Sequence, residues 1–249
     1  MKQSPPSPAL DWCLFLDVDG TLVELTDTPS QTQADPEIIS LLREVAERLG
    51  GALALVSGRR ICTLDELFAP LRLPAAGLHG VERRKADGRI QGASFADSQL
   101  DGARTAIKAL VNAHPGTLFE DKDRTIAVHF RMAPQSEQIV RESIIDIAKP
   151  LGSNYHIQAG KMLFEIKPRG FSKATAIQAF MKESPFSGRR PVFVGDDLTD
   201  QDGFAMVDAL DGISVGVGEG VQGRFYLPDV AAVRLWLRQI VALHDSHRA

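Results

Sequence analysis

Short hydrophobic runs recur along the first part of the chain and predict buried β-strands. Residues 13–16 (CLFL) and 52–56 (ALALV) are apolar throughout and bounded by polar or turn residues, as expected of strands inside a parallel sheet. Between them, Asp35 and Pro36 form a helix start, because Asp caps a helix and Pro suits its first position. Apolar residues then recur at helical spacing over 38–49, which predicts a helix with one buried face.

This alternation of strand and helix stops after the first eighty residues and resumes near residue 168. An Asp-Gly hairpin signal at 87–88 opens the different region. The elements predicted after it are a helix over 100–114, strands on either side of 122–124, a helix over 135–149, and strands over 155–158 and 162–166. We therefore expect an α/β fold: a doubly wound parallel-sheet core over 11–81 and 168–249, interrupted by an α+β cap domain over 82–167.

Two carboxylates stand where the first predicted strand ends. Asp17 and Asp19 follow the apolar run directly, and Gly20 comes next. In open α/β sheets, ligands bind beyond the carboxyl ends of the strands, and glycine lets backbone N–H groups approach an anion. The simpler alternative is an acidic turn after a core strand, since Asp and Gly are common turn residues.

A second acidic cluster follows another apolar run near the end of the chain. Residues 192–194 precede Gly195 and the carboxylates of Asp196, Asp197 and Asp200. If the strands are neighbours, each like-charge pair at 4 Å costs about 4 kcal/mol at an effective dielectric constant near 20. A magnesium ion would relieve this repulsion, because Mg²⁺ binds carboxylates together with water and phosphate oxygens. Helix capping is the alternative role for some of these acids.

Two further segments have the chemistry of an anion site. Ser57 and Gly58 follow the strand over 52–56 and precede a predicted helix, so a hydroxyl and N–H groups lie at a helix N-terminus. Lys173 precedes a helical pattern starting at 176, where a cation opposes the helix dipole unless an anion is bound. Taken singly, Ser57 and Gly58 are equally an ordinary turn signal, and Lys173 is more often a solvated surface lysine.

Together the four segments resemble the ordered motifs of the haloacid dehalogenase (HAD) superfamily of phosphotransferases. The matching segments are 17–21 (DVDGT), 57–59 (SGR), Lys173 and 195–200 (GDDLTD). Within the superfamily, the chain resembles the trehalose-6-phosphate phosphatases through 77–82 (GLHGVE), 120–122 (EDK), 129–131 (HFR), Gly160-Lys161 with Glu165, and the whole GDDLTD segment. This resemblance implies a Rossmann-like HAD core with an inserted cap. Gln201 and Ala174 depart from the family pattern, which has Glu and commonly Gly there.

The resemblance implies a role for each matching residue. Asp17 would be the nucleophile and Asp19 the general acid and base, while Ser57, Gly58 and Lys173 would bind the phosphate. Magnesium would be held by Asp17, the backbone carbonyl of Asp19, Asp196 and Asp200. We expect Gln201 outside this metal site, because one further residue turns a helical side chain by about 100°.

Substrate specificity would then depend on residues of the cap and its hinge, whose charged groups suit sugar hydroxyls. Each of them alone is more often a solvated surface residue, and His129 could be a structural histidine. These residues are His79, Gly80, Glu82, Glu120, Lys122, His129, Arg131, Lys161 and Glu165.

The reaction implied is magnesium-dependent hydrolysis of trehalose 6-phosphate through an aspartyl-phosphate, as in trehalose biosynthesis. Three alternatives stay open: another sugar-phosphate phosphatase of the superfamily, a sugar phosphomutase, and a non-catalytic sugar-binding relative. A binder has no need of both Asp17 and Asp19, which argues against the last.

Composition is consistent with a cytoplasmic enzyme that acts on a small molecule. The net charge of −4 gives no basic surface for nucleic acid, and two cysteines form no disulfide framework. Residues 1–10 are rich in Pro and Ser, so we expect a disordered leader without the apolar segment of a signal peptide. We find no apolar stretch long enough to cross a membrane. Oligomeric state is left open, with a monomer as the default.

Overall fold

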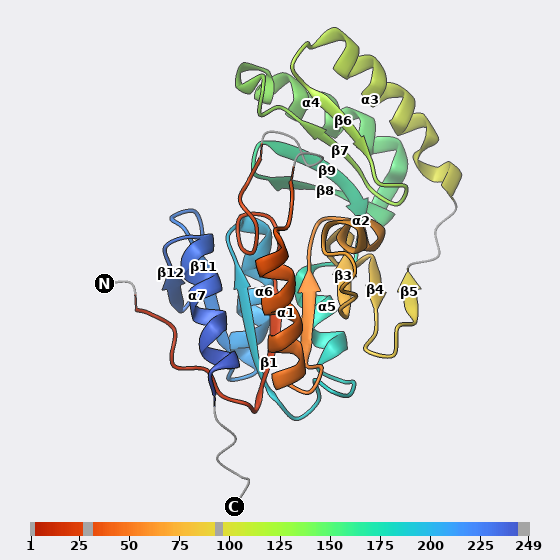
Figure 1. Cartoon of the computed structure of the whole chain (residues 1–249). Helices are drawn as coiled ribbons and strands as arrows, with labels where there is room; N and C mark the ends of the chain where they lie inside the picture. The colour runs from red at the N-terminus through yellow and green to blue at the C-terminus, as the bar shows by residue number, and fades with distance from the viewer. Residues whose placement is uncertain (1–2, 27–31, 93–96, 244–249) are drawn as a thin grey trace, which may run out of the picture. The chain divides into compact units, whose positions relative to one another are not determined.

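The computed structural model describes residues 3–26, 32–92 and 97–243, and the chain forms two compact units (Figure 1). The first unit comprises residues 1–91 and 172–249, and the second, residues 92–171, is inserted into it. Each unit has its own hydrophobic core.

The first unit is built on a sheet in the order β12-β11-β10-β1-β2-β3-β4-β5. The pairs from β12 to β3 are parallel, with Leu16 of β1 opposite Val194 of β10 and Leu55 of β2. The parallel strands are β1 (Trp12–Leu16), β2 (Leu53–Val56), β3 (Ala75–Gly77), β10 (Arg190–Gly195), β11 (Ile213–Val217) and β12 (Phe225–Leu227). The doubly wound core predicted from the hydrophobic runs is therefore confirmed.

Helices cover both faces of this sheet. Helix α1 (Pro36–Arg48) packs with α7 (Val230–Val241) on one face, and α5 (Lys173–Phe180) packs with α6 (Gln201–Ala209) on the other (Figure 1). A short helix, α2 (Ile61–Leu67), follows β2. As predicted, the Asp35 carboxylate accepts a hydrogen bond from the Ile38 amide and caps α1, with Pro36 in the first turn.

The hairpin over residues 82–91, expected in the inserted domain, instead extends the sheet of the first unit. Strand β4 (Glu82–Arg84) runs antiparallel to β3, and β5 (Ile90–Gly92) forms the edge. A strand paired with β3 satisfies backbone groups that an open edge would leave unpaired. The buried Arg84 fixes the hairpin, since its guanidinium donates to the Leu73 carbonyl and the Asp65 carboxylate.

The N-terminal segment also differs from expectation, because residues 3–10 run along the first unit. The Gln3 carbonyl accepts from the Tyr226 amide at 2.9 Å, and the Pro6 carbonyl from the indole of Trp236 at 3.3 Å. Arg189 donates to the Leu10 carbonyl at 2.9 Å. Proline removes a backbone donor but leaves the carbonyl as an acceptor, so a proline-rich segment can still be held by donors from the core.

The inserted unit is an antiparallel sheet in the order β6-β7-β9-β8 with two helices packed on it. Apolar side chains between sheet and helices form its core, including Ile107, Val128, Ile144 and Ile166. The elements are α3 (Asp101–Ala113), β6 (Leu118–Asp121), β7 (Ile126–His129), α4 (Glu137–Ala148), β8 (Tyr155–Gly160) and β9 (Leu163–Pro168). The repeated helix and strand pair predicted from the sequence is confirmed.

Close packing between α6 and β10 gives a stability prediction. A Cβ at Gly203 would lie 2.4 Å from Cε1 of the buried Phe193 ring, whereas a Cβ at Gly102 in α3 meets nothing within 4 Å. Replacing helical Gly by Ala gains up to about 1 kcal/mol, but overpacking a core costs about 1–3 kcal/mol. We therefore expect Gly203→Ala to lower the free energy of unfolding and Gly102→Ala to raise it slightly.

Urea unfolding followed by circular dichroism compares the two variants. An equal gain in both would show that the helix moves away from Phe193 without cost.

Candidate active site

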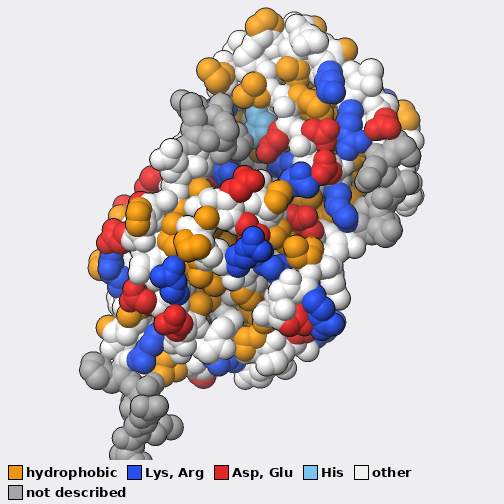
Figure 2. All heavy atoms as spheres, turned by 45° about the vertical axis from the view of Figure 1, so that its right-hand side comes forward, with side chains coloured by type: hydrophobic (Ala, Val, Ile, Leu, Met, Phe, Trp, Pro, Cys, Tyr) orange, Lys and Arg blue, Asp and Glu red, His pale blue; other side chains and the backbone are white. Residues whose placement is uncertain are grey.

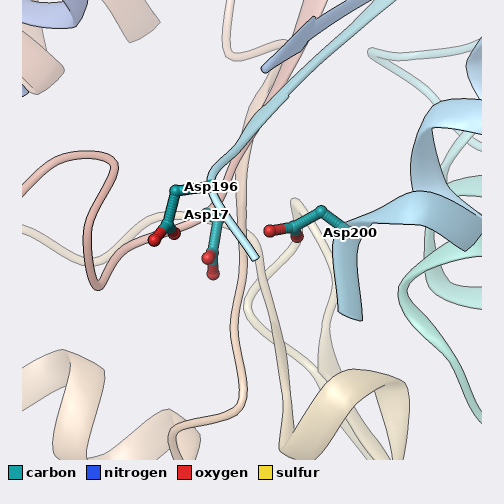
Figure 3. A group of neighbouring side chains, drawn as sticks. All are labelled: Asp17, Asp196 and Asp200. Atoms are coloured by element: carbon teal, nitrogen blue, oxygen red, sulfur yellow. The ribbon is translucent and has the colours of Figure 1, made fainter. Parts of the chain in front are cut away.

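Three carboxylates meet at the carboxyl edge of the parallel sheet in the first unit. Asp17 follows β1 and Asp196 follows the neighbouring β10, while Asp200 lies in a 3-10 turn before α6. Each residue offers a carboxylate oxygen within 4.8 Å of the others, and all three residues are buried (Figure 3). The two acidic clusters predicted to meet through neighbouring strands are therefore brought together.

Two glycines make room for these carboxylates. A Cβ at Gly20 would lie 2.2 Å from Oδ2 of Asp196, and one at Gly195 would lie 2.4 Å from Cγ of Asp200. Gly20 also has a φ of +79°, which disfavours any side chain there. The glycines of both motifs are thus required by the close approach of an acidic side chain.

Lys173 places a buried ammonium group within this cluster. It is the first residue of α5, whose N-terminus is closed by a capping box between Ser172 and Thr175. Its Nζ lies 2.8 Å from Oδ1 of Asp17 and 2.6 Å from Oδ1 of Asp200. Burial would lower the pKa of Lys173, but the two carboxylates raise it above its ordinary value. The lysine that opposes the helix dipole is therefore held by ion pairs.

The charge of the cluster is only partly balanced by Lys173. Burial raises the pKa of Asp17 well above its ordinary value; Lys173 lowers it in part, and the carboxylates of Asp200 and Asp196 raise it further. Burial also raises the pKa of Asp200. An added cation would relieve this repulsion, and a buried set of carboxylate oxygens fits a hard ion such as Mg²⁺.

Asp197 has a different use from its neighbour Asp196. Its carboxylate accepts from the Leu198 amide at 2.7 Å, and its own amide donates to Oδ2 of Asp200 at 2.9 Å. Asp197 therefore caps the turn that carries Asp200. This is the capping role that was the alternative for some of these acids. Gln201, which was expected outside the metal site, is the first residue of α6 and half-buried.

Ser57 and Gly58 lie in the turn between β2 and α2. They are close to His79, which belongs to the predicted motif at 77–82. Ser57 is buried and its carbonyl accepts from the His79 amide at 2.9 Å. The His79 imidazole lies so close to Gly58 that a Cβ there would be 2.7 Å from Nε2. Gly80 in turn approaches the Ser172 carbonyl, 2.8 Å from a built Cβ. The backbone φ angles of Leu78 and His79 are positive. The contacts at Gly58 and Gly80 therefore hold this turn in a strained conformation.

Glu82, expected to contact the substrate, is used within the fold of the first unit. Its carboxylate accepts a hydrogen bond from the Ile61 amide, the first residue of α2. It thereby satisfies an otherwise open donor at a helix N-terminus. The sequence alone could not reveal this contact, because Glu82 and Ile61 come together only when β4 pairs with β3.

Asp19 is paired with Arg59, which the sequence analysis placed in the SGR segment without assigning it a role. Arg59 Nε lies 2.7 Å from Oδ2 of Asp19, and Arg59 Nη2 lies 2.7 Å from Oδ1. Asp19 therefore does not join the group of Asp17, Asp196 and Asp200 through its side chain. Its backbone carbonyl stays a predicted metal ligand.

Four of the residues predicted for substrate recognition form one polar network in the inserted unit. Lys122 Nζ lies 3.4 Å from Glu165 and 3.5 Å from Glu120, and His129 Nε2 lies 2.8 Å from Glu120. Thr125, which the sequence analysis missed, donates to Glu165 at 2.6 Å. Glu120 lies in β6, His129 at the end of β7 and Glu165 within β9, and the turn between β6 and β7 carries Lys122 and Thr125.

The charges of this network stabilise one another. Burial would lower the pKa of Lys122, but the carboxylates of Glu165 and Glu120 raise it above its ordinary value. Burial would raise the pKa of Glu120, but a hydrogen bond from His129 and the charge of Lys122 lower it. Both shifts favour the charged forms of Lys122 and Glu120, and charged groups make stronger hydrogen bonds than neutral ones.

The other two predicted residues lie beside this network in sequence. Arg131 is two residues beyond β7 and half-buried, and Lys161 is exposed in the turn between β8 and β9. Lys167 was missed: it is buried, two residues after Glu165 on the same strand, and donates to Gln158 at 2.7 Å. The signal that could have found it is the period of two along a strand.

Surface properties agree with the composition. Acidic and basic side chains are interspersed on the face drawn in Figure 2, and the net charge is −4. Across residues 3–26, 32–92 and 97–243, the helices are too short or too polar for a membrane span.

Comparison with known proteins identifies relatives over almost the whole chain. A family model for trehalose-phosphatase matches residues 15–224. Trehalose-6-phosphate phosphatase of Escherichia coli is 40% identical over 98% of this chain and 91% of its own length. A probable trehalose-phosphate phosphatase of Sinorhizobium fredii is 39% identical over 93% of this chain and 87% of its own. The crystal structure of a trehalose-6-phosphate phosphatase related protein superposes with a TM-score of 0.78 at 28% identity, covering 92% and 97% of the chains.

The different positions of Asp196 and Asp197 give a test of the metal site. A ligand present at a hundred times its Kd stabilises a protein by about 2.7 kcal/mol, so Mg²⁺ should raise the melting temperature of the wild type. We expect Asp196→Asn to lose most of that rise and Asp197→Asn to keep it, since an Asn side chain can still cap the turn. Thermal unfolding with and without Mg²⁺ measures both.

A full Mg²⁺ effect in Asp196→Asn, or an equal loss in Asp197→Asn, would place the ion elsewhere.

Proposed function

The chain belongs to the trehalose-phosphatase family, a family of phosphoric monoester hydrolases, and on this basis we propose that it hydrolyses trehalose 6-phosphate to trehalose and phosphate with the aid of Mg²⁺. One observation carries the proposal beyond the family. Asp17 is buried beside Lys173 and two further carboxylates at the ligand-binding edge of an α/β sheet. The identity of the substrate is inferred from the relatives, and the type of reaction is inferred from this cluster.

The first chemical step is attack by Asp17 on the phosphorus. A bond forms between a carboxylate oxygen and phosphorus, and the bond to the sugar oxygen breaks, which leaves an aspartyl-phosphate. The Lys173 ammonium is 2.8 Å from Asp17, so it is placed to balance charge on the phosphoryl oxygens. Ser57 and Gly58, at the end of the neighbouring strand β2, supply a hydroxyl and backbone N–H groups for the same oxygens.

Asp19 handles the proton in both steps. As the sugar leaves, its oxygen takes a proton from the Asp19 carboxyl group; when water attacks the aspartyl-phosphate, the Asp19 carboxylate takes a proton back. The side chain remains available for this because Asp17, Asp196, Asp200 and the backbone carbonyl of residue 19 are the proposed metal ligands. When bound, Mg²⁺ neutralises the carboxylates and the phosphate so that two anions can approach one another.

We assign recognition of the sugar to the polar network of the inserted unit. Lys122 pairs with Glu120 and Glu165, and His129 pairs with Glu120; such paired groups have fixed directions from which they can hydrogen-bond to hydroxyls. Arg131 and Lys161 add donors beside the network, and His79 and Gly80 line the turn that follows β3. Glu82 acts through the position of α2, since its carboxylate is used there.

We propose a cytoplasmic enzyme that uses a small sugar phosphate as its substrate and needs neither nucleic acid nor a membrane. The net charge of −4 supports a substrate other than nucleic acid.

Phosphate release from trehalose 6-phosphate tests the activity directly. We expect rapid release with Mg²⁺ and almost none after chelation, slower release from sucrose 6-phosphate and glucose 6-phosphate, and no requirement for a sugar bisphosphate. Asp17→Asn, which keeps the shape of the side chain, should lower the rate by several orders of magnitude because the attacking carboxylate is lost.

A bisphosphate requirement would identify a phosphomutase, and more than a tenth of wild-type activity in Asp17→Asn would contradict the covalent mechanism. Preference for another sugar phosphate would overturn only the assignment of trehalose 6-phosphate as the substrate.

Sugar recognition is tested by comparing two substrates. Glu165→Gln and Arg131→Ala remove a charged hydrogen-bonding group, whose loss costs about 1.5–3 kcal/mol. We expect kcat/KM for trehalose 6-phosphate to fall by about ten- to a hundredfold, while hydrolysis of an aryl phosphate, which has no sugar, stays close to wild type. Glu137→Gln, on the exposed side of α4, is the matched control and should change neither.

Equal losses with both substrates would mean that these residues maintain the fold, and sugar recognition would have to be assigned to other groups.

A further inference from the structure

The carboxylate of Asp19 is held at two points by one guanidinium group. Arg59 Nε is 2.7 Å from Oδ2, and Arg59 Nη2 is 2.7 Å from Oδ1. This is the fork geometry by which arginine binds a carboxylate in one fixed plane. An unpaired Asp19 could turn about its side-chain bonds, so the contact selects one orientation among several.

Arg59 is itself firmly fixed, which makes it a support rather than a flexible partner. Its side chain is 10% exposed, and its carbonyl accepts from the Leu78 amide at 2.9 Å. Its amide donates to the Ser57 hydroxyl at 3.2 Å, and its Nη2 also donates to the Thr32 hydroxyl at 2.7 Å. The guanidinium is therefore held by Asp19 and Thr32, and the backbone of Arg59 is held by Leu78 and Ser57.

Asp19 still has an accessible side. Its side chain is 32% exposed, and a carboxylate oxygen can accept a second hydrogen bond in addition to the one from arginine. The pairing thus restricts where the carboxylate points without covering it. A group that exchanges protons with a substrate oxygen needs this combination of fixed direction and open access.

We propose that Arg59 is a positioning residue of the phosphatase reaction, which holds the Asp19 carboxylate in the orientation from which it exchanges protons with the leaving sugar oxygen and the attacking water. The inference rests on the proposed function, because it needs Asp19 to be the acid and base. In this role Arg59 acts through Asp19 and not on the phosphoryl group. Its loss should consequently slow most the steps that depend on proton transfer by Asp19.

This dependence on proton transfer gives a specific kinetic signature. A sugar alkoxide needs a proton as it leaves, whereas an aryl oxide hardly does. In Arg59→Ala, we expect the turnover of trehalose 6-phosphate to fall by about ten- to a hundredfold, the size of loss that misplacement of a catalytic group produces. The initial burst of aryl oxide release from an aryl phosphate should be unchanged, and the steady rate that follows, set by attack of water, should fall.

Two further variants separate positioning from other roles. Arg59→Lys keeps the charge but contacts Asp19 through one nitrogen, so it should show the same pattern to a smaller degree. The double variant Arg59→Ala/Asp19→Asn should lose no more activity than Asp19→Asn alone, because the two residues act in one step. Arg72→Ala, whose side chain is 76% exposed near Asp65, is the matched arginine control and should behave as wild type.

Several results would overturn the proposal. A reduced burst in Arg59→Ala would mean that Arg59 binds the phosphate, additive losses in the double variant would mean an independent role, and wild-type behaviour of Arg59→Lys would show that charge alone suffices. If Arg59→Ala fails to fold, Arg59→Lys decides the question by itself. If Asp19→Asn shows no difference between sugar and aryl substrates, the proposed acid and base role fails first, and Arg59 has nothing to position.

Discussion

The ion pair between Lys173 and Asp17 is the interaction on which the site depends. In the proposed reaction Asp17 attacks phosphorus and has to be ionised, yet burial and the carboxylates of Asp200 and Asp196 all raise its pKa. A buried ammonium 2.8 Å away offsets part of this effect. Because Lys173 contacts Asp200 as well, it joins the helical segment after β10 to the end of β1. Removing it would leave buried charge of one sign, which is among the costlier changes a protein interior can undergo.

Strand order and two glycines bring the residues of this interaction together. Strands β1 and β10 are far apart in sequence but parallel neighbours in the sheet, so the acids that follow them meet at one edge. Gly20 and Gly195 leave the space that the carboxylates of Asp196 and Asp200 occupy. The site is therefore set by backbone approach as much as by side-chain chemistry, and a single methyl group at either glycine would displace a carboxylate.

The two units handle charge in different ways. In the first unit, the carboxylates exceed the ammonium group that pairs with them, and the excess favours a cation. In the inserted unit, Lys122 lies between Glu120 and Glu165 and Thr125 adds a hydrogen bond, so the network is largely satisfied within itself. The first arrangement suits binding of a metal ion and a phosphate. The second suits hydrogen bonding to neutral hydroxyls, which need fixed partners more than net charge.

Periodicity and local motifs in the sequence determined the parallel core, the α+β insert and the acids at the strand ends, since buried strands, helix caps and turn residues depend on neighbours along the chain. Only the tertiary structure decided how residues 82–91 and 3–10 are used, because an edge strand and a proline-rich segment are placed by donors elsewhere in the fold. The same holds for Glu82 as a helix cap and for Arg59 as the partner of Asp19. Such contacts join residues twenty to forty positions apart. No local sequence pattern indicates which charged groups will meet when the sheet forms.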